Sequence, residues 1–157
     1  MHFSPRRIAC FATSLVVLTA SIVPTRQAMA QAPNDSPAGR WKTVDDHTGK
    51  VRSIVAIREQ SGTLFGTVES LVDPPVPNPT CYLCSGDLKD RPLVGLQVIW
   101  GFTKDGDRWS GGHVLDPETG KIYSGWIALE DGGKKLRLHG YIGISLIGRT
   151  EHWQRVE

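Results

Sequence analysis

The chain has 157 residues, with 18 Lys and Arg against 16 Asp and Glu. Three arginines and no acidic residue fall within the first thirty positions, so residues 31–157 carry 15 basic against 16 acidic side chains, a formal net charge of −1. This balance does not support nucleic-acid binding, which depends on a basic excess that neutralises phosphates.

The first thirty residues have the pattern of a secretory signal peptide: a positively charged start, an apolar run over residues 8–23, and small residues before a cleavage site after Ala30. The apolar run is short for a membrane span and ends at Pro24. We therefore predict export to the periplasm, with secretion as an alternative. We expect residues 31–38 to form a disordered leader and residues 39–157 a single domain, large enough to bury a core.

From residue 39 onward, short β-rich runs alternate with turn sequences, and no run of ten residues has a convincing helical period. The turn sequence Asp-x-x-Thr-Gly-Lys occurs twice, at 45–50 and 116–121. Its aspartate can bond its own backbone, and its glycine supplies a left-handed residue, so we expect turns there. Asp105-Gly106 predicts a tight hairpin. The predicted strands cover residues 39–44, 50–59, 63–71, 96–102, 108–115, 121–130, 135–142 and 146–155.

Closely spaced antiparallel strands favour a meander that closes on itself, because closure removes the exposed edges. Glycines inside the strands permit the necessary bends and allow large rings to lie against bare backbone. The sequence therefore predicts an all-β fold. We expect a small antiparallel up-and-down β-barrel of about eight strands, with one long loop that contains prolines and cysteines.

That loop includes residues 80–93, with Cys81 and Cys84 three positions apart and Arg91-Pro92 at its rim. In an exported protein such a pair indicates a disulfide, whose small ring would stabilise the fold by about 2 kcal/mol. A thiol-redox pair is an alternative, but it would require a thiol pKa lowered at a helix N-terminus. A zinc site is another, but it would need two further ligands. No second ligand pair occurs at a suitable spacing, so His113, His139 and His152 would have to converge in space. We predict a structural disulfide, no metal and no cofactor.

The barrel interior is the second candidate site. Eight strands can enclose one small apolar ligand, or their side chains can fill the interior completely, and both alternatives stay open. Ring-rich strands supply the candidate cavity residues Trp100, Trp109, Tyr123, Trp126, His139 and Tyr141.

Several motifs occur in a recognisable order across residues 39–153. They are Gly39-Arg40-Trp41, the two Asp-x-x-Thr-Gly-Lys turns, Cys81-x-x-Cys84, Arg91-Pro92-Leu93-x-Gly95, Gly111-Gly112-x-Val114-x-Asp116-Pro117 and Gly140-Tyr141-Ile142-Gly143. The series resembles the exported bacterial family called domain of unknown function 2147. The resemblance implies a lipocalin-like or fatty-acid-binding-protein-like barrel and no established activity. In lipocalin-like barrels the tryptophan of Gly-x-Trp plugs the floor and a late arginine packs over it. The candidates for these roles are Trp41 with Arg149 or Arg155.

Three functions follow as hypotheses. The first is non-catalytic binding of a small apolar or amphipathic, lipid-like molecule in the periplasm. The second is an envelope protein-interaction or structural module that uses the loop over residues 74–92. The third is a thiol-redox factor that uses Cys81 and Cys84. The leading hypothesis is ligand binding without enzymatic activity.

Overall fold

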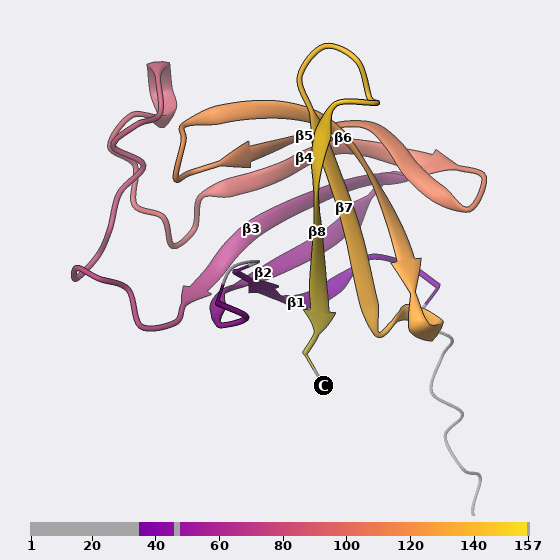
Figure 1. Cartoon of the computed structure of the whole chain (residues 1–157), viewed down its shortest axis with the longest axis horizontal. Coiled ribbons are helices and arrows are strands. Elements are labelled where there is room, and N and C mark those ends of the chain that lie inside the picture. Colours follow the sequence, from indigo (N-terminus) through magenta and orange to yellow (C-terminus); the bar gives the residue numbers. More distant parts are fainter. Residues whose placement is uncertain (1–34, 46–47, 157) are drawn as a thin grey trace, which may run out of the picture. The chain divides into compact units, whose positions relative to one another are not determined.

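The computed structural model describes residues 35–45 and 48–156. They form a closed barrel in which each strand pairs antiparallel with the next along the chain and the last pairs with the first (Figure 1). This confirms the predicted all-β, up-and-down architecture. The strands are β1 (Gly39–Val44), β2 (Val51–Gln60), β3 (Thr63–Leu71), β4 (Gln97–Asp105), β5 (Arg108–Asp116), β6 (Lys121–Glu130), β7 (Lys135–Tyr141) and β8 (Gly148–Arg155).

Two short 3₁₀ helices, η1 (Gly86–Leu88) and η2 (Asp131–Gly133), lie in the β3–β4 and β6–β7 connections. Within residues 35–45 and 48–156, no helix has the length and apolar character needed to span a bilayer. The predicted signal peptide and residues 31–34 of the predicted leader lie outside the described residues.

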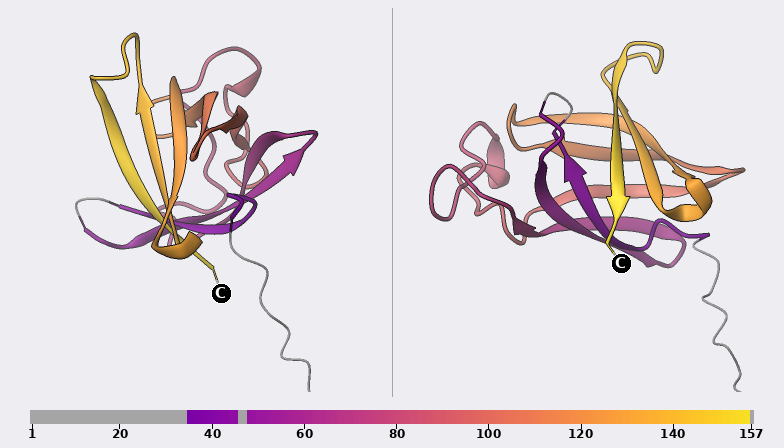
Figure 2. Two further views of the ribbon diagram at one scale, coloured as in Figure 1. Left: turned by 90° about the vertical axis from the view of Figure 1, so that its right-hand side faces the viewer. Right: turned by 60° about the horizontal axis from the view of Figure 1, so that its bottom comes forward.

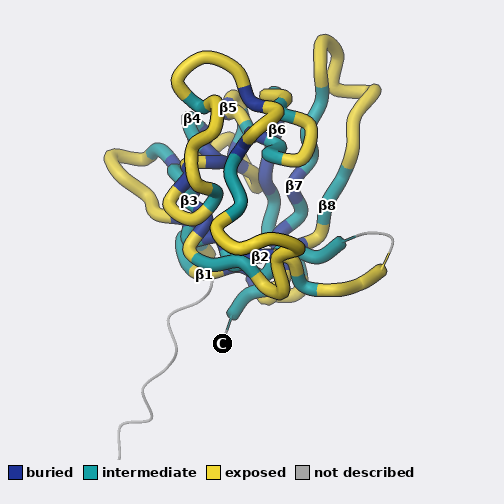
Figure 3. Tube along the Cα trace, turned by 90° about the vertical axis from the view of Figure 1, so that its left-hand side faces the viewer, coloured by how far each residue is buried: buried dark blue, intermediate teal, exposed yellow. Residues whose placement is uncertain are grey.

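Side chains fill one end of the barrel, which we call the filled end. Alternate residues of a strand point to opposite faces, so every second residue enters the interior. Burial follows this alternation along β2, β3, β6 and β7, and register shifts interrupt it in β4 and β5 (Figure 3). The largest residues buried completely in the core, apart from cysteine and proline, are Trp41, Val55, Leu64, Ile99, Phe102, Ile127 and Leu136.

Phe102 lies at the centre of the filled end, against bare backbone. A Cβ atom placed on Gly112 would lie 2.2 Å from a ring carbon of Phe102. A Cβ atom on Gly125 would lie 3.4 Å from the tip of the same ring and 2.7 Å from the carbonyl oxygen of His139. The Phe102 ring therefore excludes a side chain at Gly112, and the carbonyl of His139 excludes one at Gly125.

Trp41 and Arg155 form the floor of the filled end. The guanidinium of Arg155 lies 4.2 Å from the centre of the Trp41 ring. It also donates hydrogen bonds to three backbone carbonyls, those of Gly133 at 2.6 Å, Ala38 at 2.9 Å and Ser36 at 2.9 Å. Burial lowers the pKa of Arg155.

The second half of the predicted leader belongs to this floor. Pro37 is fully buried, and its carbonyl accepts a 2.8 Å hydrogen bond from the indole of Trp41. Ser36 and Ala38 are held by Arg155. Residues 36–38 are therefore an ordered part of the barrel, which corrects the expectation of a disordered leader there. Although the polar and proline-rich composition suggested disorder, the carbonyls of residues 36–38 accept hydrogen bonds from the partly buried guanidinium of Arg155 and the buried indole of Trp41.

The other end of the barrel, which we call the open end, carries the β1–β2, β3–β4, β5–β6 and β7–β8 connections. Both Asp-x-x-Thr-Gly-Lys sequences form turns here, and each aspartate accepts hydrogen bonds from the residues that follow it. Arg52 joins the two turns, because its guanidinium pairs with Asp45 at 2.9 Å and with Glu118. The repeated turn thus forms part of the rim of the barrel.

Candidate functional site: the barrel cavity

A cavity of about 1350 Å³ extends from the middle of the barrel to the connections at the open end. This exceeds the range of roughly 300–1,000 Å³ for small-molecule pockets, because the volume continues out through the mouth. Its inner wall is apolar, formed by inward-facing residues of six strands. They are Val55, Val68, Val98, Val114, Leu138 and Trp153.

Two charged residues of β8 also line the cavity. Arg149 pairs in register with Gly140, and Glu151 pairs with Leu138, so both belong to the inward-facing set of β8. Their charged groups lie 3.8 Å apart, and Glu151 accepts a 2.9 Å hydrogen bond from the indole of Trp153. The cavity therefore presents an acidic and a basic group above an apolar base.

The cavity wall also contains hydroxyl groups. Thr43 and Ser53, on the paired strands β1 and β2, are joined by a 2.8 Å hydrogen bond between their side-chain oxygens. Tyr123 pairs in register with Val114 and lines the opposite wall. The site combines an aliphatic interior with polar groups nearer the mouth, which suits a ligand that has both an apolar and a polar part.

The long β3–β4 connection covers part of the mouth. Its residues Pro74, Pro75, Asn78 and Tyr82 line the cavity. The loop is closed at its base by a β-bridge between Thr80 and Pro92 and by a 2.9 Å hydrogen bond from the side chain of Arg91 to the carbonyl of Asp87. Arg91 and Pro92 thus brace the loop and do not line the cavity.

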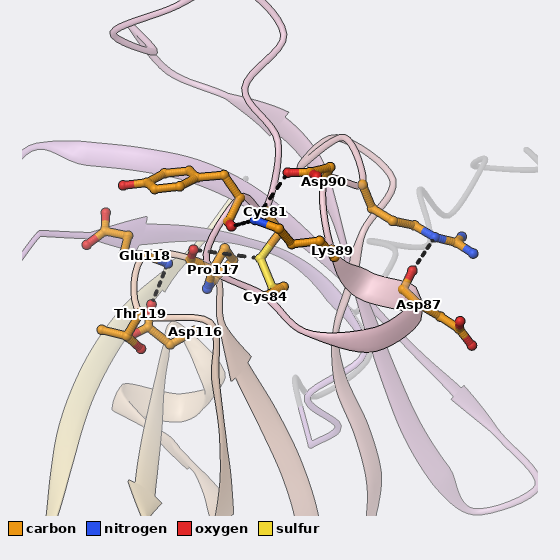
Figure 4. Close-up of a disulfide and its surroundings, with 11 residues drawn as sticks. Cys81, Cys84, Asp87, Lys89, Asp90, Asp116, Pro117, Glu118 and Thr119 are labelled. Atoms are coloured by element: carbon orange, nitrogen blue, oxygen red, sulfur yellow. Dashed lines mark hydrogen bonds and ion pairs between the residues drawn. A yellow bond between two sulfur atoms is a disulfide. The ribbon is translucent and has the colours of Figure 1, made fainter.

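Cys81 and Cys84 form a disulfide, as predicted (Figure 4). Both cysteines are buried. The disulfide segment packs on the β5–β6 turn so closely that a Cβ atom on Gly120 would lie 2.1 Å from the carbonyl oxygen of Leu83. Cys81 Sγ also lies 3.7 Å from the carbonyl oxygen of Pro117. The disulfide therefore fixes the loop against the rim of the barrel, as a structural disulfide does.

The three histidines considered for a zinc site lie apart from the disulfide. His113 stacks on Trp100 with ring centres 5.7 Å apart, and His152 lies 3.7 Å from Glu130. His139 bonds Thr150 and the backbone of Ser145. No cluster of three or more potential metal ligands occurs among the described residues.

Of the six residues predicted to line the cavity, Tyr123 does so and the other five do not. Trp109 is buried with the amine of Lys104 3.6 Å from its ring centre. Trp126, His139 and Tyr141 occupy positions of the opposite parity to the inward-facing residues of β6 and β7. Trp100 has the same parity as Val98 and Phe102 but lies outside the cavity beside His113, because the pairing of β4 with β3 shifts register on both sides of it. The prediction was wrong for these residues because both faces of the strands carry large groups, so the sequence does not show which face points inward.

On the outer face, rings and cations of β5, β6 and β7 form a cluster. His139 stacks on Trp126 with ring centres 5.2 Å apart, and Tyr141 follows at 6.1 Å from His139. The guanidinium of Arg137 lies 5.0 Å from the Trp126 ring centre, and that of Arg108 lies 5.7 Å from it. We call these five residues the outer aromatic cluster.

The expectation that either Arg149 or Arg155 packs over Trp41 is resolved by the geometry. Arg155 occupies the floor, whereas Arg149, six residues earlier on β8, lines the cavity at the opposite end. The cavity residues that sequence reasoning missed are the valines, Leu138, Trp153 and the Arg149–Glu151 pair. Inward-facing glycines do not mark the cavity in the sequence, because Gly112 and Gly125 also face inward and Phe102 fills the space beside them.

Comparison with known proteins agrees with this architecture. No curated protein matches the chain. A solved structure described as protein HP1028 from the human pathogen Helicobacter pylori, which belongs to the lipocalin family, matches with a TM-score of 0.67 and 22% sequence identity. The match covers 78% of this chain and 84% of that one, and at this identity it establishes a shared fold. A family described as an uncharacterized protein conserved in bacteria, DUF2147, matches residues 39–155. The chain therefore belongs to this bacterial family and has a lipocalin-like fold.

Proposed function

We propose that the protein binds a small amphipathic molecule in its barrel cavity, without catalysis, in the periplasm. The observation that carries the proposal is the cavity of about 1350 Å³, which has an aliphatic inner wall and a charged pair nearer the mouth. A lipocalin-like barrel that opens at one end is a common architecture for binding small ligands.

The lining distinguishes an amphipathic ligand from a purely apolar one. The valines, Leu138 and Trp153 offer an apolar surface for a hydrocarbon chain or ring. A wholly apolar ligand would remove water from Arg149 and Glu151 without replacing its hydrogen bonds, which is costly for charged groups. A ligand whose polar head lies beside this pair avoids that cost.

The rim supports a preformed site. The disulfide and the bond from Arg91 to Asp87 both brace the β3–β4 connection, and the ion pairs of Arg52 join the β1–β2 and β5–β6 turns. A rim held in place before binding reduces the conformational entropy that the ligand must otherwise overcome. The same disulfide supports an exported location, because such bonds persist in oxidising compartments.

Uptake of a fluorescent fatty-acid probe, together with mass spectrometry of organic extracts from protein purified from the periplasm, tests the proposal. We expect one probe bound per chain. A Val55→Phe, Val98→Phe double variant narrows the inner cavity and should weaken binding by about tenfold. The control, Leu83→Phe with Val94→Phe, places the same rings on exposed loop positions outside the cavity and should bind normally.

The absence of both probe uptake and a co-purified molecule would refute ligand binding. Equal loss of binding in the cavity variant and in the loop control would place the site on the β3–β4 loop instead. That second outcome would favour the protein-interaction hypothesis, since Tyr82 and Leu83 of this loop are exposed.

A further inference from the structure

The β7–β8 connection, residues 142–147, is an exposed apolar segment that we call the apolar tip. Its four aliphatic side chains expose most of their surface: Ile142 60%, Ile144 61%, Leu146 91% and Ile147 72%. The loop stands clear of the sheet in Figure 1 and projects beyond the strands in both views of Figure 2. Single exposed apolar residues are ordinary, but a contiguous group on a protrusion marks an interaction site.

The tip is braced in this exposed position. His139 donates a 3.0 Å hydrogen bond through Nε2 to the carbonyl of Ser145, and its Nδ1 lies 2.9 Å from the hydroxyl of Thr150. Within the tip, the amide of Ile147 donates to the carbonyl of Ile144 at 3.2 Å. The carbonyls of Ser145 and Ile144 and the amide of Ile147 therefore have partners inside the protein, which lowers the cost of moving the turn into an apolar phase.

Along the outer face, side chains change from aliphatic to aromatic to cationic with increasing distance from the apolar tip. No charged residue occurs from Tyr141 to Gly148. Below the tip lie the rings of the outer aromatic cluster, and the guanidinium groups of Arg137 and Arg108 contact the lowest ring, Trp126. The acidic partner of Arg137, Glu130, lies at the other end of β6, farthest from the tip.

This order matches the cross-section of one monolayer. Aliphatic side chains suit the hydrocarbon region, aromatic rings suit the headgroup level, and cations suit anionic headgroups at the surface. A convex aliphatic tip needs no shaped partner in a fluid bilayer, whereas a protein would have to supply a matching groove. We propose that the apolar tip inserts into a lipid bilayer and that the outer aromatic cluster lies at the headgroup level. Arg149 and Gly140 flank the tip and line the cavity, so docking would bring the mouth to the membrane.

Co-sedimentation of the purified chain with vesicles tests this proposal. We expect binding to vesicles of phosphatidylglycerol and phosphatidylcholine at 1:3. A Leu146→Ser, Ile147→Ser double variant should reduce the partition coefficient by about tenfold or more, because two aliphatic side chains no longer enter the bilayer. The matched control, Leu83→Ser with Val94→Ser, removes similar exposed apolar surface from the β3–β4 loop and should bind normally.

Two further measurements locate the contact. A Leu146→Trp variant should gain a blue-shifted emission component on the same vesicles, quenched by lipids brominated in their acyl chains. Arg108→Gln should weaken binding to the anionic vesicles and not to pure phosphatidylcholine, because it removes a cation that faces the headgroups.

The proposal is overturned if the wild-type chain does not co-sediment with these vesicles. It is also overturned if the tip and control variants lose binding equally. A concentration-dependent dimer, seen by light scattering in the absence of vesicle binding and dissolved by the tip substitutions, would instead identify the tip as a contact between two copies. Fatty-acid probe uptake is measured without vesicles, so membrane docking and cavity binding can fail separately.

Discussion

The filled and open ends of the barrel are built on the same strands, and they use the inward-facing positions differently. At the filled end Phe102, Trp41 and Leu136 close the interior around glycines and the partly buried Arg155. At the open end the corresponding positions carry valines, Gly140 and a charged pair, and a cavity remains. Stability is therefore concentrated in one half of the barrel, and this leaves the other half able to hold a ligand. Paired substitutions, one at each end, test this division.

The largest difference is expected for two leucines of β7. Leu136 and Leu138 are both buried and face inward, but Leu138 lines the cavity and Leu136 does not. Leu136→Ala should lower the free energy of unfolding by about 3–5 kcal/mol, because it opens a void in a packed region. Leu138→Ala should cost about 2 kcal/mol or less, since it only enlarges an existing cavity. Urea denaturation of both variants measures the difference, and equal costs would contradict the division.

Two inward-facing glycines give the second comparison. A Cβ atom on Gly112 would lie within 2.2 Å of the Phe102 ring, whereas the nearest atoms to a Cβ on Gly140 lie at 3.4 Å, an ordinary contact. Gly112→Ala should therefore destabilise the protein by about 2–3 kcal/mol through overpacking. Gly140→Ala should be within about 1 kcal/mol of wild type. Thermal melts measure the stability of both variants. A Gly112→Ala variant as stable as wild type would show that the side chains packed at the filled end can shift to accommodate the added methyl group.

Two arginines of β8 give the third. Arg155→Gln should cost about 2–3 kcal/mol, because three partly buried carbonyls lose a charged donor and the Trp41 ring loses its cation. Arg149→Gln should change stability by less than about 1 kcal/mol, because its side chain is largely exposed. It should instead weaken binding of an anionic fatty-acid probe more than that of a neutral ester probe. If Arg149→Gln lowered stability and Arg155→Gln weakened probe binding instead, Arg149 would be the structural residue and Arg155 the ligand-binding one.

These pairs also show what could be predicted from the sequence. Strand positions, closure and the disulfide followed from period-two patterns, turn sequences and cysteine spacing, and the structure confirms them. The sequence could not show which of Arg149 and Arg155 packs over Trp41, because both lie in one predicted strand. Only the pairing of that strand with β7 and β1 shows that Arg155 lies beside Trp41 and Arg149 beside Gly140. The sequence also could not show which face of each strand points into the barrel, since Trp126 and Ile127 are both plausible core residues until the sheet curvature is known.

The disulfide belongs only to the open end. Replacing Cys81 and Cys84 together by alanine should lower the free energy of unfolding by about 2 kcal/mol, the entropy of a small closed ring. Probe binding should weaken, because the β3–β4 loop is no longer fixed against the rim. Hydrogen exchange should rise in residues 72–96 and stay unchanged in the filled-end strand segments. Faster exchange at both ends would show that the loop supports the whole barrel.

The smallest effect is expected at the filled-end turn η2, where Asp131 and Lys135 form an exposed ion pair with a 2.6 Å contact. The hydrogen bond from Lys135, together with its charge, lowers the pKa of Asp131, and the same contact raises the pKa of Lys135. The contribution of the Asp131 charge to folding stability is present above the ordinary carboxyl pKa of about 4 and is lost as the pH falls through the lowered pKa of Asp131. The contribution of the Lys135 charge to folding stability is present below the ordinary lysine pKa of about 10.4 and is lost as the pH rises through the raised pKa of Lys135. Asp131→Asn, which keeps the left-handed backbone that Asn tolerates, should therefore lower the melting temperature only slightly, and only between about pH 5 and pH 9. A difference from wild type that persists at pH 2 would show that the aspartate acts through the turn backbone and not through its charge.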